Sequence, residues 1–114
     1  MAETTERASV RRLDGASVID MPAYIDISSE TALSGAYSEA AGKEALLLNF
    51  RGTEFINSSG IALIVGIMAR ARKEGRVIAA YGLSPHYREI FEITRLADFI
   101  GLYPDEQAAV AGRT

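Results

Sequence analysis

The tripeptide Ser58-Ser59-Gly60 has the clearest potential for chemistry in this sequence, because it stands between a polar connection and a long apolar segment. A serine at the start of a helix can cap it by accepting a hydrogen bond from a free backbone amide. The same free amides, at the positive end of the helix dipole, also accommodate a phosphate group. Ser58 is therefore predicted to be an N-cap, a phosphoacceptor, or both. Gly60 has no side chain, so another backbone can approach it closely.

Other kinds of site receive little support from the sequence. There are no cysteines, which excludes disulfides and thiolate metal ligands, and there is no glycine-rich phosphate loop ending in lysine. His86 is the only histidine. A hydrolase or transferase with Ser58 as nucleophile would also need a base and an oxyanion site. We expect His86 to be a surface residue at a helix start, and we expect no catalytic residue, metal or cofactor.

Composition and charge limit the partners and the location. The net charge is −3, and the twelve basic residues are spread among fifteen acidic ones, so we expect no nucleic-acid partner. The longest apolar run covers residues 61–69, shorter than the ~20 residues of a membrane-spanning helix. The polar N-terminus is unlike a secretory signal, so we expect a cytoplasmic protein. Residues 1–6 are predicted to be a flexible polar tail, and residues 7–114 a single domain.

Five strands are predicted from short apolar runs. Rough alternation over residues 8–13, the turn dipeptide Asp14-Gly15 and the apolar residues of 18–21 predict a β-hairpin. Residues 45–50 are almost wholly apolar, which is typical of a central strand covered on both faces. Further strands are predicted over 76–81 and 99–103. Residues 51–57 are interpreted as a polar connection that contains Phe55 and Ile56.

Four helices are predicted between and after these strands. The first covers 28–41 with Ser28 or Ser29 as its cap, and the second covers 58–74. The third starts at Ser84-Pro85, and the last starts at 104–106, where Asp105 and Glu106 complement the helix dipole. The order of elements predicts an α/β fold, with a mixed central sheet of about five strands and about four helices packed over it.

Three segments, in the same order, resemble the STAS domain, specifically that of the bacterial anti-sigma factor antagonists. Residues 55–65, which read FINSSGIALIV, resemble the family's signature. Tyr24-Ile25-Asp26 resembles the acidic turn after the second strand, and Leu83-Ser84-Pro85 with Ile90–Thr94 resembles the third helix. The resemblance covers roughly residues 8–112 and implies a single STAS-like domain.

What the resemblance implies is a partner switch rather than an enzyme. In that family the dephosphorylated protein binds an anti-sigma factor that is a serine kinase, and so releases a sigma factor. The kinase phosphorylates the first serine of the tripeptide, which corresponds to Ser58, and a serine phosphatase reverses the modification. We expect partner contacts from the residues around Ser58, namely Asp26, Asn57, Ser59, Gly60, Ile61 and Ile64. A homodimer is also compatible with the sequence.

Two positions depart from the family's pattern, and one has two interpretations. Asn57 stands where the family usually carries aspartate, which removes a negative charge beside Ser58. Arg95 stands where many members carry glycine, so we expect no left-handed cap there and a third helix that continues or ends differently. Asp26 is interpreted either as a partner contact, by analogy, or as a turn residue that caps the following helix.

A second hypothesis is a constitutive scaffold that is never phosphorylated. STAS domains also occur in stressosomes and as accessory subunits of lipid-transport ATPases. The apolar start of the second helix, around Ile61, Leu63 and Ile64, would then be a docking face.

Overall fold

A five-stranded mixed sheet forms the centre of the computed structural model, which describes residues 7–112. The strand order is β1-β2-β4-β6-β7; β1 is antiparallel to β2, and all other pairs are parallel. The strands are β1 (Ser9–Leu13), β2 (Ala16–Asp20), β4 (Ala45–Asn49), β6 (Ile78–Tyr81) and β7 (Gly101–Tyr103). The predicted α/β fold and its opening hairpin are confirmed, whereas the predicted tail, 1–6, lies outside the described residues.

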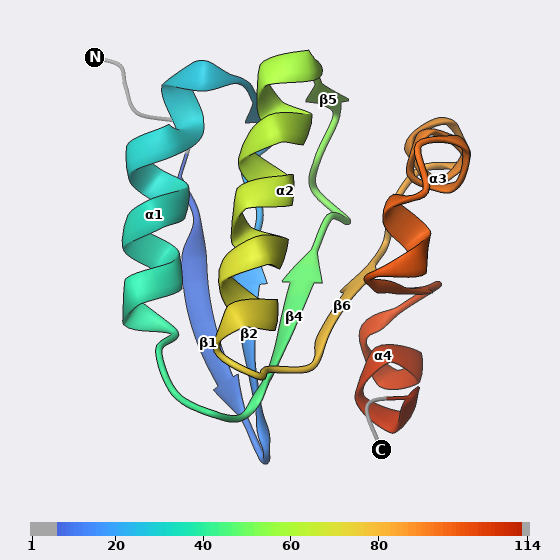
Figure 1. Ribbon diagram of the computed structural model, residues 1–114. Coiled ribbons are helices and arrows are strands. Elements are labelled where there is room, and N and C mark those ends of the chain that lie inside the picture. The colour runs from blue at the N-terminus through green and yellow to red at the C-terminus, as the bar shows by residue number, and fades with distance from the viewer. Residues whose placement is uncertain (1–6, 113–114) are drawn as a thin grey trace.

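Four α-helices pack on the two faces of this sheet. They are α1 (Glu30–Glu39), α2 (Ser58–Lys73), α3 (Pro85–Ile93) and α4 (Glu106–Gly112), with 3-10 turns at η1 (Ile27–Ser29) and η2 (Leu96–Asp98). Figure 1 shows α1 and α2 side by side in front of the sheet, both starting at the same end. No helix in residues 7–112 has the length and hydrophobicity needed to cross a bilayer.

The apolar run predicted as a covered strand is β4. Leu46 and Leu48 pack into the core beneath α1, α2 and α3, whereas Leu47 packs into the smaller core on the other face, beneath α4. All three side chains are fully buried. Successive side chains of a strand point to opposite faces, so a strand with helices on both sides must be apolar at every position.

A second, two-stranded parallel sheet joins β3 (Tyr24–Ile25) to β5 (Phe55–Ile56). The connection predicted over 51–57 therefore contains a short strand at residues 55 and 56, which was not predicted. The Asn57 amide donates to the Ile25 carbonyl at 3.2 Å, and the buried Tyr87 hydroxyl of α3 accepts from the Ile56 amide at 2.9 Å. These bonds fix the small sheet beside the N-terminal start of α2.

Two predicted helix ends differ in the structure. Asp26 caps η1 by accepting from the Ser28 amide at 2.9 Å. Ser29 occupies the predicted N-cap position of α1, but its side chain makes no capping bond to that helix. Arg95 has φ of 69° and ends α3 in the left-handed conformation that we did not expect. The left-handed conformation is less favourable than the right-handed one by about 1–2 kcal/mol for a residue other than glycine. Here the chain must turn sharply from α3 into η2, and the Arg95 guanidinium bonds to Asp98 at 2.8 Å.

Arg11 joins the edge strand β1 to α4. Its guanidinium donates to Asp20 at 2.7 Å and to Glu106 at 2.9 Å, and Glu106 also accepts from the Tyr81 hydroxyl at 2.6 Å. The hydrogen bond from Arg11 holds the pKa of both the Asp20 and the Glu106 carboxyl below their ordinary values of 3.8 and 4.5. Burial, followed by the bond to Glu106, raises the pKa of Tyr81 to about 12. Glu106 is thus a bridging residue and not merely a dipole partner, whereas Asp105 caps α4 by accepting from Ala108.

The Arg11 network predicts a loss of stability in acid. A carboxylate with a lowered folded-state pKa stabilises the fold above its ordinary pKa, and that stability is lost as pH falls from about 5 through the folded-state value. Arg11→Met should lower the free energy of unfolding at neutral pH by about 1–2 kcal/mol and flatten its dependence below pH ~5. Urea unfolding at a series of pH values measures both. An unchanged acid dependence in Arg11→Met would contradict the assignment.

Gly60 lies where the first turn of α2 meets the backbone of β3. A Cβ at residue 60 would overlap the Ile25 carbonyl oxygen and approach the Ile56 side chain to 3.0 Å. Gly66, in the same helix, has open space around it. The helix start therefore approaches β3 as closely as it does only because residue 60 is glycine.

This difference predicts opposite effects for two glycine substitutions in one helix. Gly66→Ala should raise the free energy of unfolding by up to about 1 kcal/mol, because alanine is the better helix former. Gly60→Ala should lower it by about 1–3 kcal/mol, because the overlap displaces β3. Chemical denaturation of both variants measures these changes. A Gly60→Ala protein as stable as wild type would contradict the close contact between residue 60 and the backbone of β3.

Candidate functional site: the start of helix α2

The N-cap of α2 is Asn57, not Ser58. Asn57 has an extended backbone (φ −94°, ψ −176°), and its side-chain oxygen accepts from the Gly60 amide at 2.8 Å. Ser58 is the first residue of the helix. Of the two interpretations of Ser58, the capping one is therefore wrong, because asparagine one residue earlier already fills that position. Asparagine is among the preferred N-caps.

The Ser58 side chain is free to react. It is exposed, and neither its hydroxyl nor the backbone amides of Ser58 and Ser59 have a hydrogen-bond partner within residues 7–112. The Asn57 side chain accepts from the Gly60 amide and its carbonyl accepts from the Ile61 amide, so the amides of Ser58 and Ser59 remain as donors at the positive end of the helix dipole. This arrangement can accept an anion attached to Ser58 without any change of fold.

Three exposed apolar side chains, which we call the apolar rim, lie on the elements beside Ser58. Tyr24 on β3 is 46% exposed, Ile27 on η1 64% and Phe55 on β5 48%. Each of these elements contacts α2. The rim was not predicted as a site from the sequence. The signal that could have indicated the rim is the alternation of exposed and buried side chains along a strand. Tyr24 and Phe55 are exposed, and the residues that follow them, Ile25 and Ile56, are buried. A strand of two residues is too short for this pattern to be recognised.

The two chain segments that form the site carry only negative charge. Residues 23–30 and 53–61 contain the acids Asp26, Glu30 and Glu54 and no lysine or arginine. These acids are exposed or half-exposed. A phosphate on Ser58 would therefore gain no cation from these segments and would increase an existing negative potential.

The other predicted contact residues fall into two groups. Ser59 and Ile61 are half-exposed beside Ser58, as is Asn57. Gly60 is buried against β3, and Ile64 is fully buried in the main core. Ile64 cannot contact a docked partner because it lies on the sheet-facing side of α2, so the expectation for that residue is corrected to core packing. Gly60 contributes by its lack of a side chain.

Asp26 has the capping role that one of its two interpretations predicted. Its carboxylate accepts from the Ser28 amide and the Ser28 hydroxyl, while the Ser29 hydroxyl accepts from the Asp26 amide at 3.2 Å. Only part of Asp26 is exposed. It fixes the turn that carries Ile27 of the apolar rim.

His86 is not arranged to activate Ser58. It is exposed at the start of α3 and its ring contacts Tyr87, with ring centroids 4.8 Å apart. Among the described residues, no hydrogen bond joins His86 to Ser58, and no group of three or more histidine or acidic side chains is placed to hold a metal ion. The described groups at the site can present a hydroxyl and bind an anion.

Comparisons with known proteins agree with this architecture. The STAS domain family model matches residues 7–109. A solved anti-sigma-factor antagonist (STAS) domain protein from Planctomyces limnophilus has a TM-score of 0.81 and 24% identity, with 97% of this chain and 100% of that chain covered.

Two structures of the anti-sigma factor antagonist SpoIIAA also match. Bacillus SpoIIAA in its phosphorylated form has a TM-score of 0.66 and 21% identity, covering 93% of this chain and 99% of that chain. SpoIIAA in its unphosphorylated form has a TM-score of 0.67 and 18% identity, covering 93% and 96%. No curated protein matches the chain. These identities support the fold, and the family model settles the family: the chain belongs to the STAS domain family.

Proposed function

We propose that this STAS protein is an anti-sigma factor antagonist controlled by phosphorylation of Ser58. Its dephosphorylated form binds an anti-sigma factor that is also a serine kinase, and so releases a sigma factor. Phosphorylation of Ser58 by that kinase blocks binding, and a serine phosphatase restores it. The observation that carries the proposal is the exposed Ser58 hydroxyl on the first residue of α2, beside unpaired amides and an exposed apolar rim.

The apolar rim supports the binding half of the proposal. Large apolar side chains that remain exposed near one another are typical of protein interaction sites, and aromatic residues are enriched in interface hot spots. Tyr24 and Phe55 are held in register by the β3–β5 sheet, so they are ordered before a partner arrives. Ser58 lies three residues after Phe55 and shares its surroundings.

The electrostatics support the switching half. An unmodified serine is small and neutral, so a partner can cover it at little cost. A phosphoserine adds ~1.5–2 negative charges, which a covering partner would have to leave buried without a cation. The free amides at the start of α2 stabilise the phosphate in the unbound protein. Both effects favour dissociation without any refolding.

The phosphorylation site can be tested directly with a serine kinase of the anti-sigma factor class from the same organism. Incubation with that kinase and ATP should raise the intact mass by one phosphate, and Ser58→Ala should abolish the gain. Ser59→Ala is the matched control and should keep it, since it changes a neighbouring serine of the same helix turn. A wild-type protein that gains no phosphate, or a Ser58→Ala protein that still does, would contradict the proposal.

The apolar rim predicts that Phe55 contributes much of the affinity for the anti-sigma factor. Phe55→Ala should weaken binding roughly 30-fold or more, the effect of losing about 2 kcal/mol at an interface hot spot. Phe99→Ala is the matched control, because Phe99 is equally exposed (52%, against 48% for Phe55) but stacks under Arg72 at the other end of α2. Calorimetric titration measures both variants; equal affinities for the two would place the interface elsewhere.

The scaffold hypothesis remains the second candidate, favoured by Asn57 in place of the family's usual aspartate. An accessory subunit of a larger assembly could use the same apolar rim without modification of Ser58. Affinity purification from cells distinguishes the two, because the antagonist should co-purify a kinase, whereas a scaffold should co-purify a transporter ATPase or a large homologous assembly.

A further inference from the structure

The groove between α1 and α2 has opposite charges at its two ends. It encloses about 350 Å³, and its apolar floor includes Leu33, Leu63 and Ile67. Glu30 lines the groove from the first turn of α1, and Arg70 lines it from the last turns of α2. Because the two helices start at the same end of the sheet (Figure 1), the acid and the base are separated along the groove.

Helix α2 carries no charge over its first three turns. Residues 58–69 contain no acidic or basic side chain; the exposed Gly66 lines the groove, whereas the exposed Val65 and Ala69 line a separate hollow beside η2. A surface helix normally presents charged residues to solvent. An added Cβ at Gly66 would meet no atom within 4 Å, so the surface is open at the middle of the helix.

We propose that a second copy of this chain covers the groove, in a symmetric dimer whose α2 helices cross antiparallel near Gly66. A two-fold axis perpendicular to α2 at that point reverses the direction of the second α2. It brings Arg70 of each chain toward Glu30 of the partner subunit, so that one symmetry operation makes two ion pairs. The absence of a side chain at Gly66 allows the helices to approach closely at the crossing.

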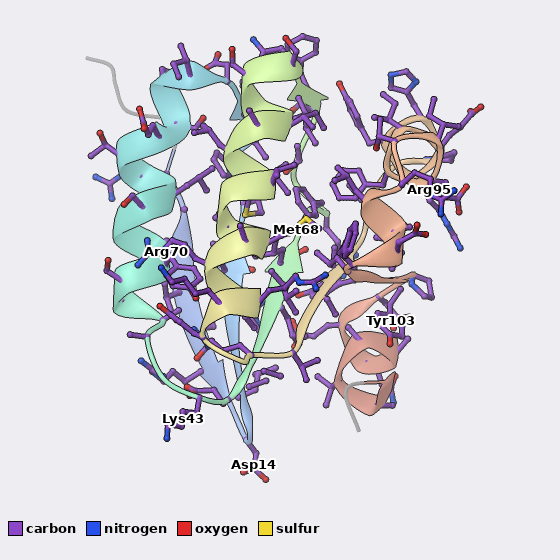
Figure 2. All side chains as sticks on the ribbon, in the orientation of Figure 1. Asp14, Lys43, Met68, Arg70, Arg95 and Tyr103 are labelled. Atoms are coloured by element: carbon purple, nitrogen blue, oxygen red, sulfur yellow. The ribbon has the colours of Figure 1, made fainter. Side chains whose placement is uncertain are left out.

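Both charged groups are available for these pairs. Neither Glu30 nor Arg70 forms an ion pair within residues 7–112. The Arg70 guanidinium lies 4.1 Å from the centroid of the Tyr37 ring, which holds the cation beside the groove while leaving its N–H donors free. Figure 2 shows Arg70 at the side of α2 that faces α1.

The self-complementary charge pattern identifies the occupant as a second copy. An acid and a base at opposite ends of one groove match each other under a two-fold rotation, whereas a parallel arrangement leaves both unpaired. An axis at Gly66 relates Ser58 to residue 74, so the last turn of the partner subunit's α2 would lie near Ser58. The dimer thus covers part of the proposed antagonist site, but its existence does not depend on the proposed function.

The dimer is tested by sedimentation velocity of the full chain, without kinase, over roughly a hundredfold range of concentration. Wild type should show a concentration-dependent dimer. Glu30→Arg and Arg70→Glu should each weaken it about tenfold or more, because each reverses both ion pairs, and the double variant Glu30→Arg/Arg70→Glu should restore it. A wild-type monomer at every concentration, or a dimer indifferent to both single reversals, would overturn the proposal.

Glycine substitutions provide a second test that leaves the fold intact. Gly66→Gln should abolish the dimer by filling the crossing point, while its better helix propensity keeps the monomer folded. Gly35→Gln is the matched control, since Gly35 is also an exposed helical glycine with open space but does not line the groove. Loss of the dimer in Gly35→Gln but not in Gly66→Gln would place the interface on the other side of α1.

Discussion

Residue 60 has no room for a side chain, and the rest of the candidate site depends on that contact. The first turn of α2 touches the backbone of β3 at Ile25, whose carbonyl also accepts the Asn57 amide. β3 is paired with β5, and β5 is held from α3 by the Tyr87 hydroxyl. The exposed hydroxyl of Ser58 and the apolar rim therefore belong to one rigid unit. A partner that docks there meets a surface that is already ordered, which reduces the entropy lost on binding.

The same helix start separates the stability of the protein from the proposed phosphorylation switch. The core beneath α2 is apolar and closed by Ile64, Ile67 and Met68, whereas the charge of the modification would be added outside it. Phosphate at the first residue of a helix is compatible with the backbone amides but not with an acidic, largely apolar interface. The fold can thus remain the same in both states while the surface changes. Because α2 also carries the uncharged face beside the groove, one helix presents two surfaces, and Ser58 lies at the boundary between them.

Much of this architecture could be predicted from the sequence, because its main signals are long enough to read. The run at 45–49 indicated a covered strand, and the polar-to-apolar boundary at Ser58 indicated an exposed helix start. The rim residue Phe55 could not be recognised, since its strand has two residues. Ile64 was misplaced because an almost uniformly apolar helix does not reveal which side faces the sheet. The left-handed Arg95 follows from the path of the chain into η2, and local sequence preference did not indicate it.

The central claim is that a phosphate on Ser58 changes which protein can dock at the start of α2. The most direct measurement is the affinity of the anti-sigma factor kinase that modifies Ser58 for this protein in its phosphorylated and unphosphorylated forms, compared by calorimetry under identical conditions. The account predicts that the phosphorylated form binds at least about a hundredfold more weakly, with an unchanged far-ultraviolet circular dichroism spectrum. Equal affinities of the two forms would contradict it.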